Sequence, residues 1–263
     1  MLRKAAVKDI FYPGESGELK GMIDKFLDGF QQKKLDGKLK ALIVPHAGYR
    51  YSGSIAAEGY KYLKGLDQSR CWKILLLGPS HHLPFYGAAP SSSSEWELPF
   101  GNIFVKDVRD ELESFSEISE VQDVDIEEHS LEVQVPFIQR CLKNFELYPL
   151  LLGQIRAEKL ANDLLDFCSR DDVVVVVSSD LSHFKPYKDA QDTDLETCNA
   201  IKEGDVERFK EVGDACGRKG IETLMHISEK LNWQRDMLTY KNSGDTASDK
   251  SRVVGYTSFI FYK

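Results

Sequence analysis

Four almost uninterrupted apolar runs constrain the fold of this chain more than any other feature of its sequence. They are KALIVPH (40–46), WKILLLGPS (72–80), ELYPLLLG (146–153) and DVVVVVSSD (172–180). Runs of this kind are typical of strands in a parallel sheet whose two faces are both covered by helices. A fifth segment, RVVGYTSFIFYK (252–263), alternates more and predicts a strand that closes the chain.

Helical patterns separate these strands. Apolar residues recur at helical spacing in four segments, residues 16–30, 52–63, 155–170 and 220–231. The segment EHSLEVQVPFIQRCL (128–142) alternates like a strand, yet it also has a helical apolar face, and Pro136 disfavours a central strand. We therefore expect a helix with a local bend there. Alternating strands and helices predict a single α/β domain, residues 1–263, with a largely parallel central sheet covered by helices on both faces.

The composition argues against two broad classes of partner. A formal net charge of −8 over 263 residues gives no general basic face for nucleic acid or an anionic membrane. The longest dense apolar run, VVVVV (173–177), is far too short to cross a bilayer, and the first residues lack the apolar segment of a secretory signal. Five scattered cysteines without a CxxC pair are typical of a reduced chain. We expect a cytoplasmic protein with no nucleic-acid or membrane partner.

The apolar runs end on residues that suit chemistry. ALIVP is followed by His46, ILLLGPS by His81 and His82, and VVVVVSS by Asp180, with His183 three residues later. In open α/β sheets, ligands bind beyond the carboxyl ends of the strands. We therefore expect these side chains to share one site.

A further histidine, His129, precedes an amphipathic segment and lies beside Glu127 and Glu128. Neutral imidazole is the commonest metal ligand, and a carboxylate can serve as a hard ligand or hold the second ring nitrogen. Structural zinc sites are closed by four protein ligands and normally use cysteine, whereas two histidines plus one oxygen ligand is the pattern of non-haem iron enzymes. The sequence therefore favours a catalytic or regulatory metal, with metal-free acid–base use of the same histidines as the alternative.

Six motifs in this chain resemble those of the Memo family, whose prokaryotic members are labelled AmmeMemoRadiSam system protein B. The motifs are PHAGYRYSG (45–53), LGPSHH (77–82), EEHSLEVQVPF (127–137), SSDLSHF (178–184), CGRKGI (216–221) and the tail pattern Y-x-N-S…VVGY (240–256). They occur in the family's order and cover essentially the whole chain. The label of the prokaryotic members implies association with a radical-SAM system.

The Memo family is similar in fold to the class III extradiol dioxygenases, which hold Fe(II) with two histidines and a carboxylate and cleave catechols with O₂. The resemblance implies that His46 and His81 are metal ligands. It implies that His183 acts as an acid–base near bound substrate, with Asp180 beside it, and that His129 lies either behind the metal ligands, as a supporting partner, or in the pocket wall. Fe(II) is the expected metal, with copper or zinc as alternatives and a metal-free pocket as a third.

The tail motif departs from the family pattern. The resemblance implies a cysteine ligand at the position of Thr246, and a threonine hydroxyl is a weak neutral ligand. We expect the adjacent Asp245 to supply the third ligand, which would complete two histidines and one carboxylate. The alternative is a tail loop that does not bind metal.

The remaining residues around these motifs have expected supporting roles. His82 follows His81, and adjacent side chains of an extended segment diverge, so His82 should support the loop or the pocket rather than the metal. Tyr49 and Tyr51 follow His46 and are candidates for the wall of an aromatic-binding pocket.

Three functions fit this sequence. The first is metal-dependent oxidoreductase chemistry on a small aromatic or redox-active substrate, in the manner of a dioxygenase. The second is a non-enzymatic pocket that binds a peptide or sequesters metal. The third is a hydrolase that would use Ser80, Ser178, Ser179 or Ser182, but no G-x-S-x-G nucleophile motif is present, and we rank it last.

Overall fold

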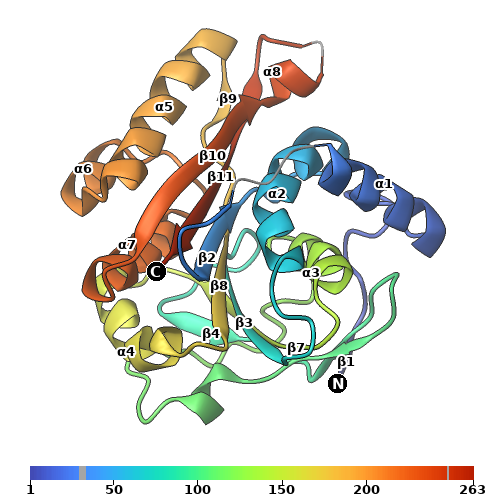
Figure 1. Ribbon diagram of the computed structural model, residues 1–263, viewed down its shortest axis with the longest axis vertical. Coiled ribbons are helices and arrows are strands. Elements are labelled where there is room, and N and C mark those ends of the chain that lie inside the picture. The colour runs from blue at the N-terminus through green and yellow to red at the C-terminus, as the bar shows by residue number, and fades with distance from the viewer. Residues whose placement is uncertain (30–33, 248) are drawn as a thin grey trace.

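A mixed eight-stranded sheet forms the centre of the protein (Figure 1). The computed structural model describes residues 1–29, 34–247 and 249–263. The strands of the large sheet are β2 (Leu39–Val44), β3 (Trp72–Pro79), β4 (Ala88–Pro90), β7 (Phe145–Leu152), β8 (Val173–Ser178), β9 (His183–Lys185), β10 (Gln234–Asn242) and β11 (Val253–Tyr262). Their order is β10-β11-β2-β8-β3-β7-β4, and β9 pairs with β11. A small second sheet contains β1 (Leu2–Arg3), β5 (Glu95–Trp96) and β6 (Ile103–Phe104).

The five strands expected from the apolar runs are all present, and the α/β class is confirmed. The expected largely parallel arrangement is wrong. Strands β2, β8, β3 and β7 run parallel, whereas β11, β10, β4 and β9 pair antiparallel. The reason is that β11 forms an antiparallel hairpin with β10. Strand β10 is polar and half-buried, so its sequence contains no apolar run from which a strand could be predicted. The hairpin returns the chain to β2 in the opposite direction.

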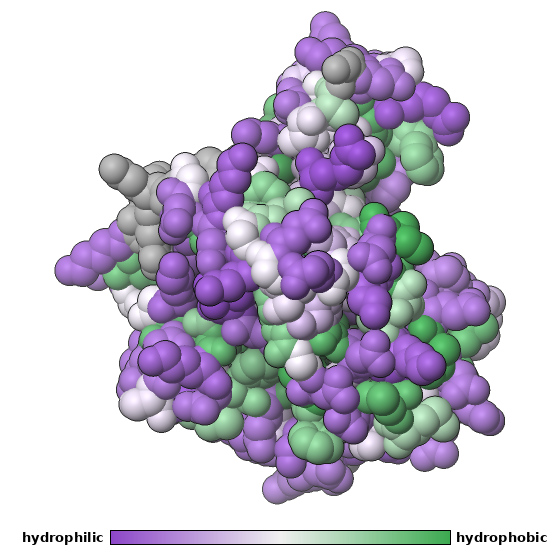
Figure 2. All heavy atoms as spheres, turned by 90° about the vertical axis from the view of Figure 1, so that its right-hand side faces the viewer, coloured by the Kyte–Doolittle hydropathy of each residue, from purple (hydrophilic) through white to green (hydrophobic). Residues whose placement is uncertain are grey.

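Helices cover both faces of the sheet, as the sequence predicts (Figure 1). One face is packed by α1 (Ser16–Asp28), α2 (Tyr49–Lys64) and α3 (Val135–Cys141), and the other by α4 (Ala157–Ser169), α5 (Tyr187–Glu203), α6 (Val206–Val212) and α7 (Arg218–Lys230). Strand β3 serves both layers, since Ile74 and Leu76 face the first core and Leu75 and Leu77 the second. This double burial explains the continuous apolar runs. Hydrophilic side chains predominate on the face in Figure 2, with smaller apolar patches between them.

Several helices differ from the sequence-based expectation. Helices α5 and α6 were not expected, because α5 is largely polar with a narrow buried stripe. Helix α2 begins at Tyr49, whereas the expected helical segment begins at Ser52. The segment 128–142 is a loop as far as a short 3-10 helix, Glu132–Gln134, which leads into α3. Pro136 lies in the first turn of α3, where its missing N–H costs nothing.

Two smaller points complete the comparison with the expected helices. The expected end of the first helix, Phe30, lies outside the described residues. Among the helices that the structure describes, none is both long and apolar enough to cross a membrane.

Candidate metal centre

The site lies at the carboxyl ends of three adjacent parallel strands. His46 follows β2, His81 follows β3, and Asp180 follows β8, which lies between the other two. Parallel pairing brings these ends to one edge of the sheet, as expected for an α/β protein. A cavity of about 420 Å³ is found there, lined by Phe11, His46, Ala47, Gly48, His81, His82, His129, Asp180, His183 and Val254.

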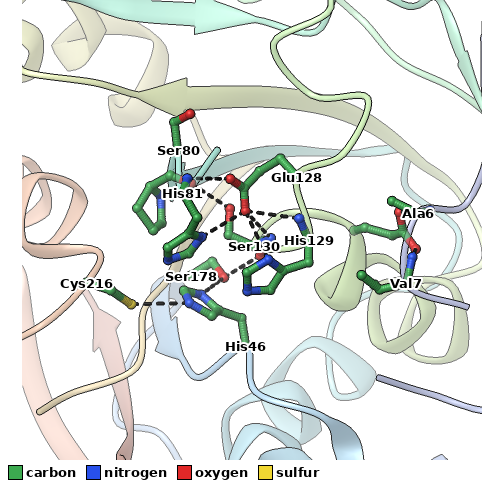
Figure 3. Close-up of polar contacts among 12 residues, drawn as sticks. Ala6, Val7, His46, Ser80, His81, Glu128, His129, Ser130, Ser178 and Cys216 are labelled. Carbon is green, nitrogen blue, oxygen red and sulfur yellow. Dashed lines mark hydrogen bonds and ion pairs between the residues drawn. The ribbon is translucent and has the colours of Figure 1, made fainter. Parts of the chain in front are cut away.

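Three imidazoles form a compact cluster in this cavity (Figure 3). His46, His81 and His129 each offer a ring nitrogen, and these nitrogens lie within 4.8 Å of one another. The ring centroids are 5.2 Å apart for His46 and His81, 5.4 Å for His46 and His129, and 4.7 Å for His81 and His129. The described part of the chain contains no other group of His, Cys, Asp or Glu with this geometry.

The tautomer of His46 follows from its hydrogen-bond network. Its Nδ1 is 2.9 Å from the hydroxyl of Ser178. That hydroxyl donates its single proton to the carbonyl of Ser130 at 2.5 Å and accepts from Gln134 Nε2 at 2.8 Å. His46 Nδ1 must therefore carry the proton, which leaves the lone pair on Nε2.

A carboxylate orients His81 in the same way. Glu128 accepts from His81 Nδ1 at 2.9 Å and from the His81 backbone N–H at 2.5 Å. Burial alone would raise the pKa of Glu128, but the hydrogen bonds from His81 and from the Ser130 N–H hold it well below its usual range. An ionised carboxylate only accepts, so His81 Nδ1 carries the proton of this contact, and Nε2 is the ring nitrogen left to face a ligand. Such a histidine–carboxylate pair is the usual support of a metal-binding imidazole.

The environment keeps two of the three rings neutral at physiological pH. Burial, together with the neighbouring His129 and His81, lowers the pKa of His46 well below its ordinary value. Burial also lowers the pKa of His129 to about 4, although Glu128 opposes that shift. Neutral imidazoles retain the lone pair that a metal ion needs.

Asp180 and His183 lie on the β8 side of the cavity. Asp180 Oδ1 accepts the backbone N–H of His46 at 2.8 Å. Burial raises the pKa of Asp180 to about 7, against the lowering effect of hydrogen bonds from the backbone of His46 and Ala47. Burial lowers the pKa of His183, which is the first residue of β9. The cavity therefore has a carboxyl group, Asp180, that can hold or release a proton near neutral pH, and an imidazole, His183, whose lowered pKa favours its neutral form, both beside the imidazole cluster.

Four residues expected at the site lie elsewhere in the structure. Asp245 is exposed in helix α8 (Ser243–Thr246), where its carboxylate accepts from the Asn242 backbone N–H at 2.9 Å and from the Tyr187 hydroxyl at 2.6 Å. Neither it nor Thr246 lines the cavity, and His129 holds the third position of the cluster.

The two tyrosines are not among the cavity-lining residues either. Tyr49 is buried in the core, and its hydroxyl donates to the Val133 carbonyl at 2.6 Å. Tyr51 lies in the first turn of α2, beneath the Arg50 guanidinium. Both belong to the helix that follows β2 rather than to a loop over the pocket.

Sequence reasoning did not assign several residues of the site the roles that they have in the structure. Glu128 and Ser178 orient ring nitrogens, and Phe11 supplies apolar wall from a distant N-terminal segment. The clearest sequence signal was the Glu128–His129 pair, in which only the histidine was given a role. Cys216 also lies in the site, with its Sγ 3.2 Å from His46 Nε2. Its pairing with His46 spans most of the chain, so no local pattern indicates it.

Comparisons with known proteins show the family of the chain. The family model described as "Memo-like protein" matches residues 3–260. A MEMO1 family protein of Methanobrevibacter smithii is 34% identical over 99% of this chain and 100% of its own length. A MEMO1 family protein of Aquifex aeolicus is 33% identical over 99% of both chains. Two full-length relatives above 30% identity and a family model over nearly the whole chain lead to one conclusion: the chain belongs to the Memo family.

Proposed function

We propose that this protein binds a divalent metal, Fe(II) foremost, through His46, His81 and His129, and uses it for redox or oxygen chemistry on a small aromatic substrate. The observation that carries this proposal is the cluster of three ring nitrogens within 4.8 Å of one another. Imidazole ligands suit iron, copper, zinc and nickel, whereas magnesium and calcium prefer oxygen. The choice of iron and of an oxygen-dependent reaction rests on the resemblance of the sequence motifs, through the Memo family, to the class III extradiol dioxygenases.

The residues present fit such a metal. Ser178 and Glu128 hold the Nδ1 protons of His46 and His81, so each ring offers its Nε2 lone pair. When bound, the ion would supply one-electron redox chemistry that no protein side chain here provides. The three nitrogen donors leave coordination positions open for a substrate.

Other residues of the cavity would handle the substrate and its protons. A volume of about 420 Å³ is in the range of small-molecule sites. Phe11 and Val254 give it apolar wall for an aromatic ring. We assign to His183 the transfer of a proton to or from the bound substrate, with Asp180 as a second proton-holding group.

A second candidate function is supported by a hollow that adjoins the metal cavity. This hollow of about 560 Å³ shares Phe11, His82 and His129 with the cavity and is otherwise lined by residues of the N-terminal segment and of the loop before His129. A continuous trough of this kind suits an extended ligand such as a peptide. In that case the protein would be a binding module, and the metal would position the ligand.

The deciding experiment is anaerobic reconstitution with Fe(II), followed by metal analysis and O₂-uptake measurements over a panel of catechols. The proposal expects near-stoichiometric iron, and O₂ uptake that is lost in His183→Ala while iron is retained. Iron binding without uptake on any catechol would favour the binding module. Wild-type protein that retains no Fe(II), Cu or Zn after reconstitution would contradict the metal site.

A further inference from the structure

Phe184 has a backbone conformation that a bulky residue rarely adopts. Its φ of 60° lies in the left-handed region, which is disfavoured for most side chains other than glycine, asparagine and aspartate. Strand β9 pairs with β11 (Figure 1), and in this pairing His183 lies opposite Val254. Lys185 lies opposite Val253, so Phe184 is the extra residue of a bulge in β9. Bulges often direct a side chain beside a functional site.

Packing does not offset the strained backbone of this residue. The Phe184 side chain is 61% exposed, so little of its apolar surface is removed from water. Strained residues without a packing role cluster at ligand sites. Phe184 directly follows His183, which lines the metal cavity together with Val254. The two ring centroids are 5.7 Å apart, so the exposed phenyl ring lies beside the cavity, within reach of a ligand that extends out of it.

The guanidinium of Arg252 lies over this phenyl ring, with its Cζ 5.1 Å from the ring centroid. Arg252 is exposed and directly precedes β11. Within the part of the chain that the structure describes, no carboxylate forms an ion pair with it. The carboxylate nearest in sequence, that of Asp249, accepts instead from the Ser251 backbone N–H and hydroxyl, at 2.8 and 2.7 Å. A guanidinium that contacts a ring through its face keeps the N–H donors of its edge free for an anion.

The charge of Arg252 is uncompensated in an acidic protein. The chain has a formal net charge of −8, which repels anions from the molecule as a whole. On β9, Lys185 is neutralised by Asp214 at 2.8 Å. Arg252 therefore gives the edge of the cavity a local attraction for a negative group.

We propose that Phe184 and Arg252 bind the acidic group of the substrate, which makes the substrate class an aromatic carboxylate. The aromatic ring lies in the metal cavity, where Phe11 and Val254 supply apolar wall, and the carboxylate accepts from the edge of the Arg252 guanidinium. Phe184 holds that guanidinium in position through the face of its ring. This inference rests on the proposed function and names the class of substrate that the same site takes.

Two catechols of nearly equal shape test the recognition of charge. They are 3,4-dihydroxybenzoate, which is ionised at neutral pH, and the neutral 3,4-dihydroxybenzamide. Calorimetric titration of Zn(II)-loaded protein measures their binding without turnover, because zinc has no redox chemistry. We expect wild-type protein to bind the carboxylate at least about tenfold more tightly than the amide, since hydrogen bonds to charged groups contribute at least about that factor.

Arg252→Gln should abolish this difference by weakening the binding of the carboxylate and leaving that of the amide unchanged. Arg70→Gln is the matched control, because Arg70 is also exposed and lies over a ring, that of Trp72, at 4.9 Å. Trp72 begins β3, so this control lies at the opposite end of the strand from the cavity.

Phe184→Asn separates a binding role from a structural one. Asparagine tolerates the left-handed conformation, so we expect the urea midpoint of this variant to be no lower than that of wild-type protein. We expect its affinity for the carboxylate to fall about threefold, because the guanidinium loses the ring beneath it. A lower midpoint with unchanged affinity would show that Phe184 serves the fold and would overturn its role in binding.

The remaining outcomes distinguish this inference from the proposed function. Equal affinities of wild-type protein for the carboxylate and the amide would overturn the substrate class and leave an aromatic substrate standing. A preference for the carboxylate that persists in Arg252→Gln would overturn the role of Arg252. Zn(II)-loaded protein that binds neither catechol would overturn the inference together with the aromatic substrate of the proposed function.

Discussion

At the scale of single residues, the site depends on the groups that hold the far side of each imidazole. Glu128 is the clearest case, since it accepts from the ring and the backbone of His81 and from the backbone of His129 and Ser130. It thereby sets the positions of two imidazoles at once. Its fully buried carboxylate is stable there only because these donors replace water.

Glu128→Gln keeps the size of this side chain but replaces one acceptor oxygen by a donor. We expect the affinity for Zn(II) to fall about 10- to 100-fold, as is typical when the outer partner of a metal-binding histidine is altered. Competition with a chromophoric chelator measures the change. Glu127→Gln is the control because Glu127 is exposed next to it. Unchanged affinity in Glu128→Gln would show that the orientation of His81 does not matter to the metal.

The two adjacent histidines after β3 should differ in how much metal affinity is lost when each is replaced, measured in the same assay. His81 belongs to the cluster of three nitrogens, whereas His82 is outside it and its ring centroid is 6.3 Å from that of His129. We expect His81→Ala to lose at least about a hundredfold in metal affinity and His82→Ala to lose less than about tenfold. Equal losses in both variants would contradict the assignment of His81 as the ligand.

At the scale of elements, a buried ion pair connects β1 to the segment that carries Glu128 and His129. Arg3 Nη1 is 2.5 Å from Glu132 Oε2, both side chains are fully buried, and Arg3 also donates to the carbonyls of Asp125 and Glu128 at 2.6 Å. Glu132 in turn accepts from the Tyr12 hydroxyl and from two backbone N–H groups of the N-terminal segment. The N-terminal strand therefore holds the loop that delivers the third imidazole.

Arg3→Ala should remove this connection and leave the charge of Glu132 buried without its partner. We expect a loss of about 3 to 5 kcal/mol in the free energy of unfolding, the cost of breaking a buried ion pair from one side. Chemical denaturation measures it, with Lys4→Ala as an exposed neighbouring control. A loss below about 1 kcal/mol would contradict this, because it would show that the Arg3–Glu132 pair contributes no more than an ordinary surface ion pair.

At the scale of the whole molecule, stability in acid should depend on a carboxylate far from the site. Glu111 accepts from Lys73 at 2.8 Å, from Arg170 at 2.6 Å and from Tyr148 at 2.9 Å, and so joins β3, the end of α4 and β7. The hydrogen bond from Lys73, followed by those from Arg170 and Tyr148, lowers the pKa of Glu111 to about 2, against the opposing effect of burial.

The sign of the pH dependence follows from this lowered pKa. The unfolded chain binds a proton at Glu111 near its ordinary pKa of 4.5, and the folded protein does so only at about 2. The stabilisation is complete above pH 4.5 and is lost as the pH falls toward 2. We expect wild-type protein to lose about 1 kcal/mol more than Glu111→Gln between pH 6 and pH 3, after allowing for partial solvent screening. Parallel pH profiles of the two proteins, measured by urea denaturation, would contradict this.

The sequence by itself determined the sheet core and most of the edge where the site lies. The runs of β2, β3, β7 and β8 are readable because burial on both faces removes polar residues from every position. The carboxyl ends of parallel strands meet at one edge, which brings His46, His81 and Asp180 together. Local pattern was sufficient for these features because each one follows from the element that contains it.

Only the tertiary structure decided the direction of the outer strands and the membership of the metal cluster. The β10–β11 hairpin makes the sheet mixed rather than largely parallel. The sequence of the polar strand β10 does not indicate the direction in which it pairs. His129 enters the cluster, whereas Asp245 caps a short helix elsewhere. Cys216 meets His46 from a loop far along the chain. A side chain beyond the end of a strand points where its packing and hydrogen bonds direct it, and those partners come from distant parts of the sequence.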